Sequence, residues 1–513
     1  MQRRLHGFTL DRRRLLLASG AVGLAPVSRI AAQATPDAEV MDELVIDLSG
    51  PPDHLTPALT YSVRDWSILH SIYDSLLDFG PEGDLVPLAA EEFSTDDAMT
   101  FRVRLREGMT FHDGSPVTTS AITRSVRHIQ DAESQISDLY SVITEVREID
   151  DLNAEIVTSE PSPWLPAQIA VWGVLFPESA TDESLATAPV GSGPYIFESW
   201  EAGSAITLRR NPDYFADSPK GTALAERVVF RFVPEAATRV ADLATGAAHI
   251  IAEVPADQID AVESSGHVAL SAPILGTAFV RIATGVEPFD DPRVNRALNH
   301  AVDVQAIADA LVGEGANRLA SVFPDPRGLG FDESLEPFTY DPDRARELLA
   351  EAGFEDGFDA EFEMVAGSRS DVVESIVAYF GDVGVRVSIV SSELAAFNQG
   401  WPDDSAPPLR YATWRPFYDP QSFLGLVIHR DGFLSRYENP VAAELIDDGS
   451  VAPSAEERAA IYHELGRELQ ENPAAIYLWN LVSTYGVNRD VTGWRPRGDE
   501  YIIPVRPPVA EGA

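Results

Sequence analysis

Alternation of apolar and polar residues predicts strands at several places along the chain. The segment 101–106 alternates Phe, Val and Leu with arginines, which is typical of a half-buried strand with a basic outer face. Runs rich in β-branched and aromatic residues predict further strands over 43–48, 154–157, 227–233, 385–389 and 410–414, and a hairpin over 196–210.

Apolar residues that recur every three or four positions predict helices. The stripe at positions 68, 69, 72, 76 and 77 predicts a helix over 68–77. Other helices are predicted over 120–132, 238–245 and 372–381, and from the N-caps Asp291, Asp341 and Ser454. Gly246 and Gly353 are expected to end two of them. Strands and helices alternate in two long blocks, which indicates two α/β lobes.

The stretch 189–195, Pro-Val-Gly-Ser-Gly-Pro-Tyr, predicts a sharp turn. Gly191 and Gly193 can adopt positive φ or let another backbone approach closely. No strand-to-helix context surrounds this Gly-Ser-Gly triplet, so it does not indicate a phosphate-binding loop.

The first 34 residues are typical of an export signal. A twin-arginine pattern at 11–17 precedes an apolar run, and Ala32-Gln33-Ala34 is a small-x-small cleavage site. The chain contains no Cys, so neither a disulfide framework nor a Cys-anchored lipoprotein is expected. The sequence therefore predicts a periplasmic or otherwise extracytoplasmic protein, soluble or loosely membrane-associated.

The charge of the chain excludes some partners. The net charge is −43, and the leader holds six Arg and one Asp, so the remainder carries −48. Such a surface repels nucleic acid, and no nucleic-acid partner is expected. Lys220 is the only lysine.

Three motifs resemble the extracytoplasmic solute-binding proteins of peptide and nickel ABC importers, family 5. They are the segment 189–215 with its Gly-Ser-Gly-Pro-Tyr and Asn-Pro-Asp-Tyr runs, the segment 108–118 with Phe-His-Asp-Gly, and the segment 289–303 with Phe-Asp-Asp. The resemblance implies an α/β, two-lobed periplasmic-binding-protein-like fold with an extra small domain inserted in the first lobe. It implies domain I from 35–60, 189–272 and 480–513, domain II from 61–188, and domain III from 273–479.

The same resemblance implies a ligand cleft lined by the loop after the strand 410–414. The expected ligand-binding residues are Tyr61, Trp172, Trp414, Arg415, Tyr418, Asp419 and His429. Peptide-binding members carry an Asp three residues after the Trp, and here that place is taken by Pro416 or Phe417. A zwitterionic or cationic small molecule suits Arg415 and Asp419, although Asp419 before Pro420 is equally typical of a turn.

The function implied is the substrate-binding subunit of an ABC importer, which captures a peptide-like or other small solute and delivers it to permease and ATPase subunits. A nickel-complex-binding protein is an alternative, because the run from Thr413 to Leu424 resembles nickel-binding members. An exported hydrolase is a second alternative, although the chain shows no Gly-x-Ser-x-Gly, Ser-x-x-Lys or His-Glu-x-x-His motif. We expect a monomer with no catalytic residues, no metal site and no cofactor, and we interpret His112-Asp113 as a turn.

Overall fold

A ten-stranded sheet runs through the protein in the order β15-β14-β16-β13-β17-β12-β1-β11-β9-β8. The computed structural model describes residues 40–508 with gaps at 61, 81–83, 133, 314, 325–328, 402, 404 and 416–417, so the predicted export signal lies outside the described residues. The strands are β1 (Met41–Leu48), β8 (Tyr195–Glu201), β9 (Ala205–Arg210), β11 (Ala225–Phe232), β12 (Ile250–Ile251), β13 (Val268–Ile282), β14 (Asp359–Val365), β15 (Arg386–Ser392), β16 (Leu409–Trp414) and β17 (Ala475–Val487).

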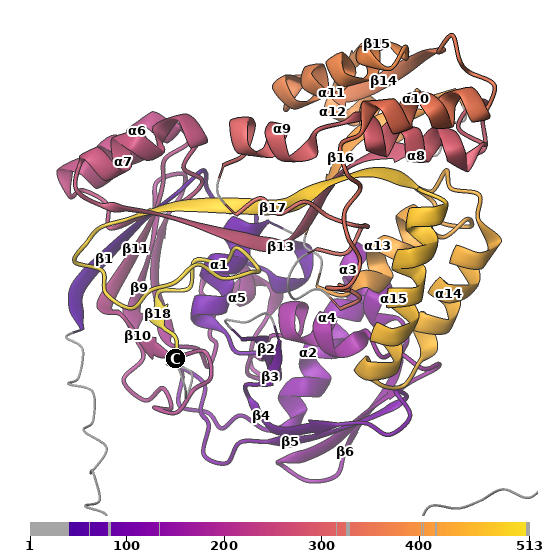
Figure 1. Cartoon of the computed structure of the whole chain (residues 1–513). Coiled ribbons are helices and arrows are strands. Elements are labelled where there is room, and N and C mark those ends of the chain that lie inside the picture. Colours follow the sequence, from indigo (N-terminus) through magenta and orange to yellow (C-terminus); the bar gives the residue numbers. More distant parts are fainter. Residues whose placement is uncertain are drawn as a thin grey trace, which may run out of the picture. The chain divides into compact units, whose positions relative to one another are not determined.

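Two long antiparallel strands, β13 and β17, join the two ends of this sheet (Figure 1). At one end, β1 is parallel to both β11 and β12, and we call this end the first lobe. At the other end, β14 is parallel to both β15 and β16, and we call this end the second lobe. The pairing of β13 with β17 is irregular between Pro273 and Phe279, so the connection between the lobes is not a uniform ladder.

Each lobe also contains helices. The first lobe carries α6 (Ala236–Thr245) and α7 (Ile259–Ser264). The second lobe carries α8 (Pro292–Ala301), α9 (Val304–Leu311), α10 (Pro342–Glu351), α11 (Ser370–Asp382), α12 (Leu394–Gln399), α13 (Pro420–Phe423), the π-helix η3 (Leu424–Ile428), α14 (Pro440–Val451) and α15 (Ala455–Glu471). The predicted N-caps are confirmed, because the side chains of Asp291, Asp341 and Ser454 accept backbone hydrogen bonds at the starts of α8, α10 and α15.

A separate four-stranded antiparallel sheet, in the order β4-β5-β7-β6, lies within residues 61–188. Its strands are β4 (Ala90–Ser94), β5 (Thr100–Leu105), β6 (Ile143–Glu148) and β7 (Asn153–Thr158), and the helices nearby in sequence are α1 (Val63–Ile72), α2 (Thr119–Asp131), α3 (Gln135–Tyr140), α4 (Leu165–Trp172) and α5 (Asp182–Thr187). One hydrophobic core is shared by this sheet and the first lobe, whereas the second lobe has cores of its own. The short elements are η1 (Pro57–Leu59), η2 (Ala256–Gln258), β2 (Leu77–Phe79), β3 (Leu85–Pro87), β10 (Thr222–Ala223) and β18 (Val505–Arg506).

The helix predicted over 68–77 is wrong in its second half. α1 ends at Ile72, Tyr73 is extended, and Leu77 begins β2. The cause is tertiary, because the backbone N–H of Gly193 donates to the carbonyl of Ile72 at 2.8 Å. A side chain on Gly191 would overlap that same carbonyl oxygen. The close backbone approach expected of the stretch 189–195 is therefore confirmed, and it occurs where α1 ends.

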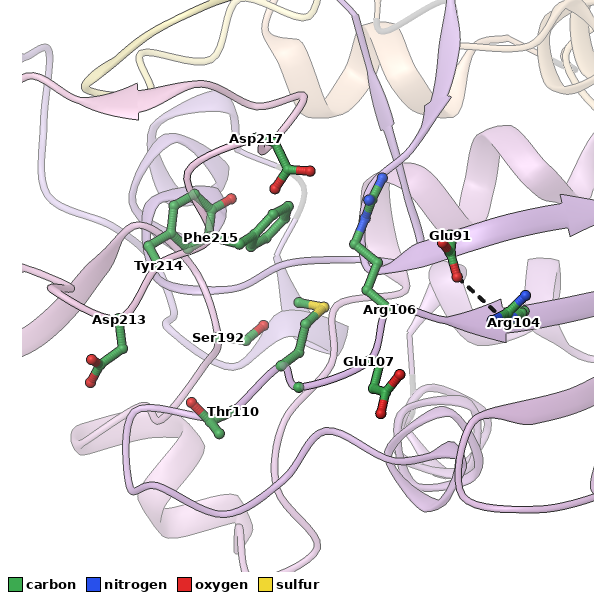
Figure 2. A pocket seen from close by; sticks show the side chains of 12 residues that line it. Glu91, Arg104, Arg106, Glu107, Thr110, Ser192, Asp213, Tyr214, Phe215 and Asp217 are labelled. Atoms are coloured by element: carbon green, nitrogen blue, oxygen red, sulfur yellow. Dashed lines mark ion pairs between the residues drawn. The ribbon is translucent and has the colours of Figure 1, made fainter.

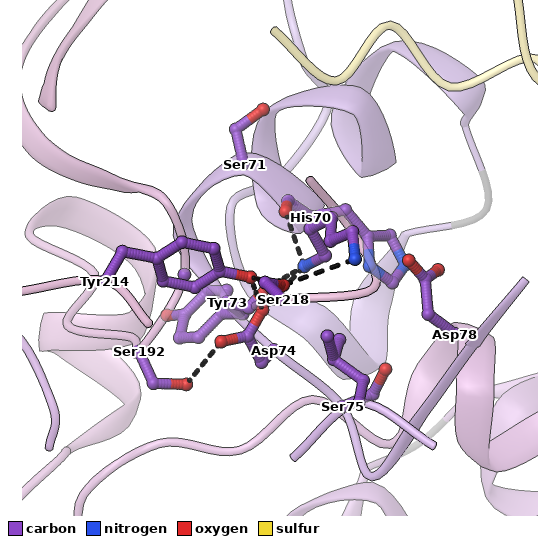
Figure 3. A network of polar contacts seen from close by, with 12 residues as sticks. His70, Ser71, Tyr73, Asp74, Ser75, Asp78, Ser192, Tyr214 and Ser218 are labelled. Carbon is purple, nitrogen blue, oxygen red and sulfur yellow. Dashed lines mark hydrogen bonds and ion pairs between the residues drawn. The ribbon is translucent and has the colours of Figure 1, made fainter. Parts of the chain in front are cut away.

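A buried ion pair lies just after α1 (Figure 3). The ammonium of Lys220 lies 2.8 Å from a carboxylate oxygen of Asp74, and both side chains are fully buried. Lys220 also donates to the backbone carbonyls of His70 and Tyr73, and Asp74 accepts from the hydroxyls of Tyr214 and Ser192. Because all these groups are removed from water, the pair holds the end of α1 to the segment before β10.

Candidate functional site

A groove of about 810 Å³ lies between the two lobes, and its lining comes from both. From the first lobe come residues 253–257, which follow β12. From the second lobe come Arg369 after β14 and Arg415 after β16, and Glu500 comes from the C-terminal segment. β12 is parallel to β1, and β14 is parallel to β16. The groove thus lies at the carboxyl ends of parallel strands of both lobes, where open α/β sheets bind ligands.

Arg415 and Glu500 form an ion pair beside this groove. One terminal nitrogen of Arg415 lies 2.6 and 2.7 Å from the two carboxylate oxygens of Glu500. Burial raises the pKa of Glu500, and the charge of Arg415 opposes that shift. The Arg415 side chain remains 50% exposed, and its other guanidinium nitrogens have no partner among the described residues. Arg415 can therefore accept a further anionic group.

Two residues of the groove have an unusual backbone conformation. Glu253 has a φ of 52° and Glu500 a φ of 65°, in the left-handed region that side chains disfavour. Such conformations typically cost about 1–3 kcal/mol each and cluster at functional sites. Glu253 accepts a hydrogen bond from the hydroxyl of Ser49, the residue after β1. Arg239 donates to the backbone carbonyl of Glu253 at 3.1 Å, and its guanidinium interacts with the negative charge of Glu253. The Glu253 carboxylate therefore contributes a negative charge to the groove.

The remaining charged residues of the groove include a second arginine. Arg369 pairs with Asp371 at 2.9 Å and donates to the carbonyl of Leu311 at 2.8 Å. The opposite wall carries Asp257, and the middle of β17 contributes Ser483 and Thr484. The groove thus presents both signs of charge together with hydroxyl groups, which suits a small polar or zwitterionic solute.

Trp414, the last residue of β16, lines a neighbouring pocket of about 410 Å³ in the second lobe. Its half-buried ring packs edge-on against Phe423, with the ring centroids 5.4 Å apart. Trp414 and Arg415 thus stand at adjacent positions with different surroundings. The first contributes to an apolar wall and the second to the charged groove.

Tyr418 and Trp172 meet in an aromatic cluster. Tyr418 stacks on Phe79 at 5.3 Å and meets the edge of Trp172 at 6.2 Å. Its hydroxyl shares a short hydrogen bond with that of Tyr501, and burial raises the pKa of Tyr418 well above its usual value. The cluster joins the loop after β16, the helix α4 and the C-terminal segment. Neither Tyr418 nor Trp172 is among the residues that line the groove.

Asp419 and His429 lie in other surroundings. Asp419 is buried, caps the start of α13, and accepts hydrogen bonds at 2.7 Å from two nitrogens of Arg458. His429 follows η3, and its Nε2 lies 3.4 Å from Asp447. Neither residue lines the groove or the pocket beside Trp414. Tyr61 is not among the described residues, and the same holds for Pro416 and Phe417.

Sequence reasoning missed Arg369, Glu253 and Glu500. Arg369 could have been predicted from the sequence, because it follows a strand. Ligands of α/β proteins bind at the carboxyl ends of parallel strands. Glu253 and Glu500 could not have been predicted in this way, because no sequence pattern indicates a positive φ at a glutamate. Only the packing of distant segments places them beside Arg415.

A further pocket of about 320 Å³ lies beside the four-stranded sheet (Figure 2). Arg104 pairs there with Glu91 at 3.4 Å, and Arg106 lies over the ring of Phe215 at 5.6 Å. On the basic outer face predicted for 101–106, Arg102 likewise pairs with Asp96 at 2.8 Å. This pocket shares no lining residue with the groove.

Among the described residues, no group of three or more His, Asp or Glu side chains is arranged to hold a metal ion. In the same part of the chain, no helix is both long and apolar enough to span a membrane.

His70 provides a pH-dependent prediction. Its ring stacks on Tyr501, and burial together with the charge of Lys220 lowers its pKa to about 3. An unfolded histidine titrates near 6.5, so protonation favours unfolding as the pH falls below that value. The contribution of neutral His70 is present above about pH 6.5 and falls by about 2 kcal/mol between pH 7 and 5.

Denaturant unfolding of wild type and His70→Gln at both pH values measures this contribution. We expect the variant to lose less stability on acidification than wild type. Equal losses in the two proteins would contradict the assignment.

Comparison with known proteins gives a consistent result. Residues 84–433, more than half of the chain, match the family described as "Bacterial extracellular solute-binding proteins, family 5 Middle". The glutathione-binding protein GsiB of Shigella flexneri is 27% identical over 300 residues, 57% of this chain and 58% of the relative. This chain thus spans somewhat more than half the length of that relative. The heme-binding protein A of Haemophilus influenzae is 24% identical over 454 residues, 77% of this chain and 78% of the relative.

Solved structures share the fold. The structure of HbpA2 from Haemophilus parasuis superposes with a TM-score of 0.80 at 24% identity, and covers 90% of this chain and 98% of that one. The murein tripeptide binding protein MppA, in an unliganded open form, gives a TM-score of 0.78 at 18% identity over 91% of this chain and 97% of that one. The expected two-lobed α/β periplasmic-binding-protein fold is confirmed, and the chain belongs to family 5 of the bacterial extracellular solute-binding proteins.

Proposed function

We propose that the protein captures a peptide-like or other small solute in the groove between its lobes and delivers it to the permease of an ABC importer. The observation that carries this proposal is the Arg415–Glu500 pair, which links the second lobe to the C-terminal segment beside a groove built from strand ends of both lobes. A ligand that contacts both walls stabilises the closed arrangement by its differential affinity for it.

The domain division predicted from the sequence fits this role. Domain I would hold the first lobe, domain II the four-stranded sheet, and domain III the second lobe, with boundaries at 61, 189, 273 and 480. β13 and β17 would then be the connection that bends as the lobes open and close, and their irregular pairing near Thr277 supports this.

Export through a twin-arginine signal over 1–34 is part of the proposal. It rests on the twin-arginine pattern, the apolar run after it and the small-x-small site Ala32-Gln33-Ala34. We propose that the exported protein acts as a monomer and without catalysis. The support for the absence of catalysis is that GsiB and heme-binding protein A are, by name, binding proteins.

The nickel-complex and hydrolase alternatives are less favoured. The described residues hold no cluster of metal-binding side chains, and His429 lies beside Asp447 and is not among the groove residues. In the groove, Asp371 pairs with Arg369 and Glu500 pairs with Arg415. Carboxylates paired with arginines are more typical of a binding surface than of the general acid and base of a hydrolase.

The test is native mass spectrometry with elemental analysis on the chain from Thr35, purified gently from rich medium. A small organic mass that is released unchanged supports the proposal. Nickel near one per chain would favour the nickel alternative, and a chemically altered ligand would favour a hydrolase.

Trp414→Ala is expected to weaken solute binding at least tenfold while the protein stays folded. The indole lines the pocket next to Arg415, and loss of a half-buried indole removes substantial apolar contact. Isothermal titration calorimetry and a thermal unfolding scan measure the two quantities. Trp200→Ala, in β8 of the first lobe, is the matched control and should leave the affinity unchanged. Unchanged affinity with a collapse in stability would mean that Trp414 serves only the core.

A further inference from the structure

Tyr418 joins the hydrophobic cores of the two lobes. It lies between β16 and α13 and therefore belongs to the second lobe. Its side chain packs against one core of that lobe and also against the core that the first lobe shares with the four-stranded sheet. The described residues include no other apolar side chain that packs against both of these cores. The Tyr418 ring thus crosses the boundary between the lobes.

Three aromatic residues of the shared core receive the Tyr418 ring, and we call them the socket. The ring of Phe79 stacks on that of Tyr418 with 5.3 Å between the centroids, and Trp172 meets it edge-on at 6.2 Å. The hydroxyl of Tyr501 shares a hydrogen bond with that of Tyr418. All three socket side chains are buried. Aromatic pairs in these geometries stabilise a contact beyond the area that they bury, so the socket holds Tyr418 in place.

A buried network of charges fixes the socket itself. Arg497 donates to the carboxylate of Asp78 and to the carbonyl of Phe79, each at 3.0 Å. Arg497 also pairs with Asp499 at 2.7 Å, and Asp499 accepts from the backbone N–H of Tyr501 at 3.0 Å. Two of the three socket residues are therefore tied to one arginine, and their positions do not depend on Tyr418.

The segment that carries Tyr418 is fixed in the second lobe. Asp419, the next residue, accepts from two nitrogens of Arg458 on α15 at 2.7 Å. Three residues before Tyr418, Arg415 pairs with Glu500, the neighbour of the socket residue Tyr501, at 2.6 Å. We call this pair and the Tyr418–socket contact together the interlobe contact. Because both of its sides are organised in advance, its formation costs little conformational entropy.

The interlobe contact lies partly outside the groove. Arg415 and Glu500 line the groove, whereas Tyr418 and the socket residues do not. A solute in the groove can therefore bind while the Tyr418 ring stays in the socket. The contact of Tyr418 then adds to the contacts of the solute and does not compete with them.

We propose that the interlobe contact holds the lobes closed in most molecules of the solute-free protein, so that closure is set by the chain as well as by the solute. A solute that binds the closed arrangement has an apparent affinity proportional to the fraction of molecules already closed. The interlobe contact then raises the affinity for every such solute alike and leaves selection among solutes to the groove. This inference rests on the proposed function and adds to it how closure is regulated.

Distances between the lobes test this inference. The chain contains no Cys, so Ala244→Cys on α6 and Glu374→Cys on α11 give one exposed site for a spin label in each lobe. The labelled protein is unfolded in guanidinium, dialysed and refolded, and mass spectrometry verifies that no solute remains bound. Double electron–electron resonance then gives the distribution of distances between the two labels.

Three further variants are compared with the labelled parent protein. Tyr418→Ala should lower the ratio of closed to open molecules about tenfold, since the aromatic contacts and the hydroxyl contact are both lost. Arg415→Gln keeps those contacts and should lower the ratio about threefold, as expected for a half-exposed ion pair. Tyr340→Ala removes an exposed tyrosine of the same lobe whose ring meets Tyr379, and it is the matched control that should leave the distribution unchanged.

The parent protein should show mainly the short distance. A parent that is mainly open, or the same distribution in Tyr418→Ala, Arg415→Gln and the parent, would overturn the inference and leave the proposed function standing, because a solute alone can close the lobes. Should Tyr418→Ala fail to refold, Arg415→Gln decides the outcome. Failure of the proposed function has a different signature, which is that the protein purified from rich medium retains no solute.

Discussion

Lys220→Met is expected to lower the free energy of unfolding by about 3–5 kcal/mol, the typical cost of removing one partner of a buried ion pair. The carboxylate of Asp74 would stay fully buried without its counter-charge. The carbonyls of His70 and Tyr73 would also lose the ammonium that donates to them at 3.0 and 2.8 Å. Methionine matches the length of the lysine side chain, so the loss reports on charge and hydrogen bonding rather than on a cavity.

Two further variants serve as controls for this prediction. Arg104→Met removes one partner of a surface pair whose side chains are 51% and 49% exposed, and it should cost no more than about 1 kcal/mol. The double variant Lys220→Met with Asp74→Asn should be more stable than Lys220→Met alone, since no unpaired charge remains buried. Guanidinium unfolding of the four proteins measures all of these quantities. A loss below about 1 kcal/mol for Lys220→Met would show that the pair contributes little.

The end of α1 is a feature that the sequence pattern did not predict. The starts of α8, α10 and α15 were predictable, because an N-cap depends on a few neighbouring residues. The end of α1 was not, because an apolar stripe continues past Ile72 and the chain turns only where Gly193 and Lys220 reach it from more than a hundred residues away. Local patterns predict local structure, and tertiary contacts decide the rest.

The site shows the same division. A strand that leads aromatic and charged residues into a proline-containing loop is typical of a ligand-facing segment, so the sequence predicts ligand contacts for Trp414 and Arg415. That role stays a prediction, and the structure places Trp414 in a pocket and Arg415 in the groove. Glu253 and Glu500 meet Arg415 only in the folded chain, and the sequence gives no sign of it. The prediction for Asp419 as a cation ligand stays untested, but its carboxylate already holds Arg458.

Arg458→Met is the corresponding prediction for the second lobe, and about 3–5 kcal/mol of unfolding free energy should again be lost. Arg458 is 3% exposed in its side chain and donates to both carboxylate oxygens of Asp419 at 2.7 Å. Burial alone would lower the pKa of Arg458, yet the carboxylate of Asp419 holds it above its usual value, so the charge is present in the folded state. Removal of the arginine leaves a buried carboxylate unpaired at the start of α13.

Solute binding should weaken in Arg458→Met as well, because Asp419 anchors the loop that carries Tyr418 and follows Arg415. Arg467→Met, on the same helix, is the matched control, since its pair with Asp332 is 3.2 Å long and its own side chain is 55% exposed. That variant should change stability by no more than about 1 kcal/mol and leave the affinity unchanged. Equal behaviour of the two variants in denaturant unfolding and calorimetry would mean that the loop is positioned by its aromatic contacts alone. If Arg458→Met lost much of its stability but kept full affinity, the Arg458–Asp419 pair would stabilise the fold without contributing to solute binding.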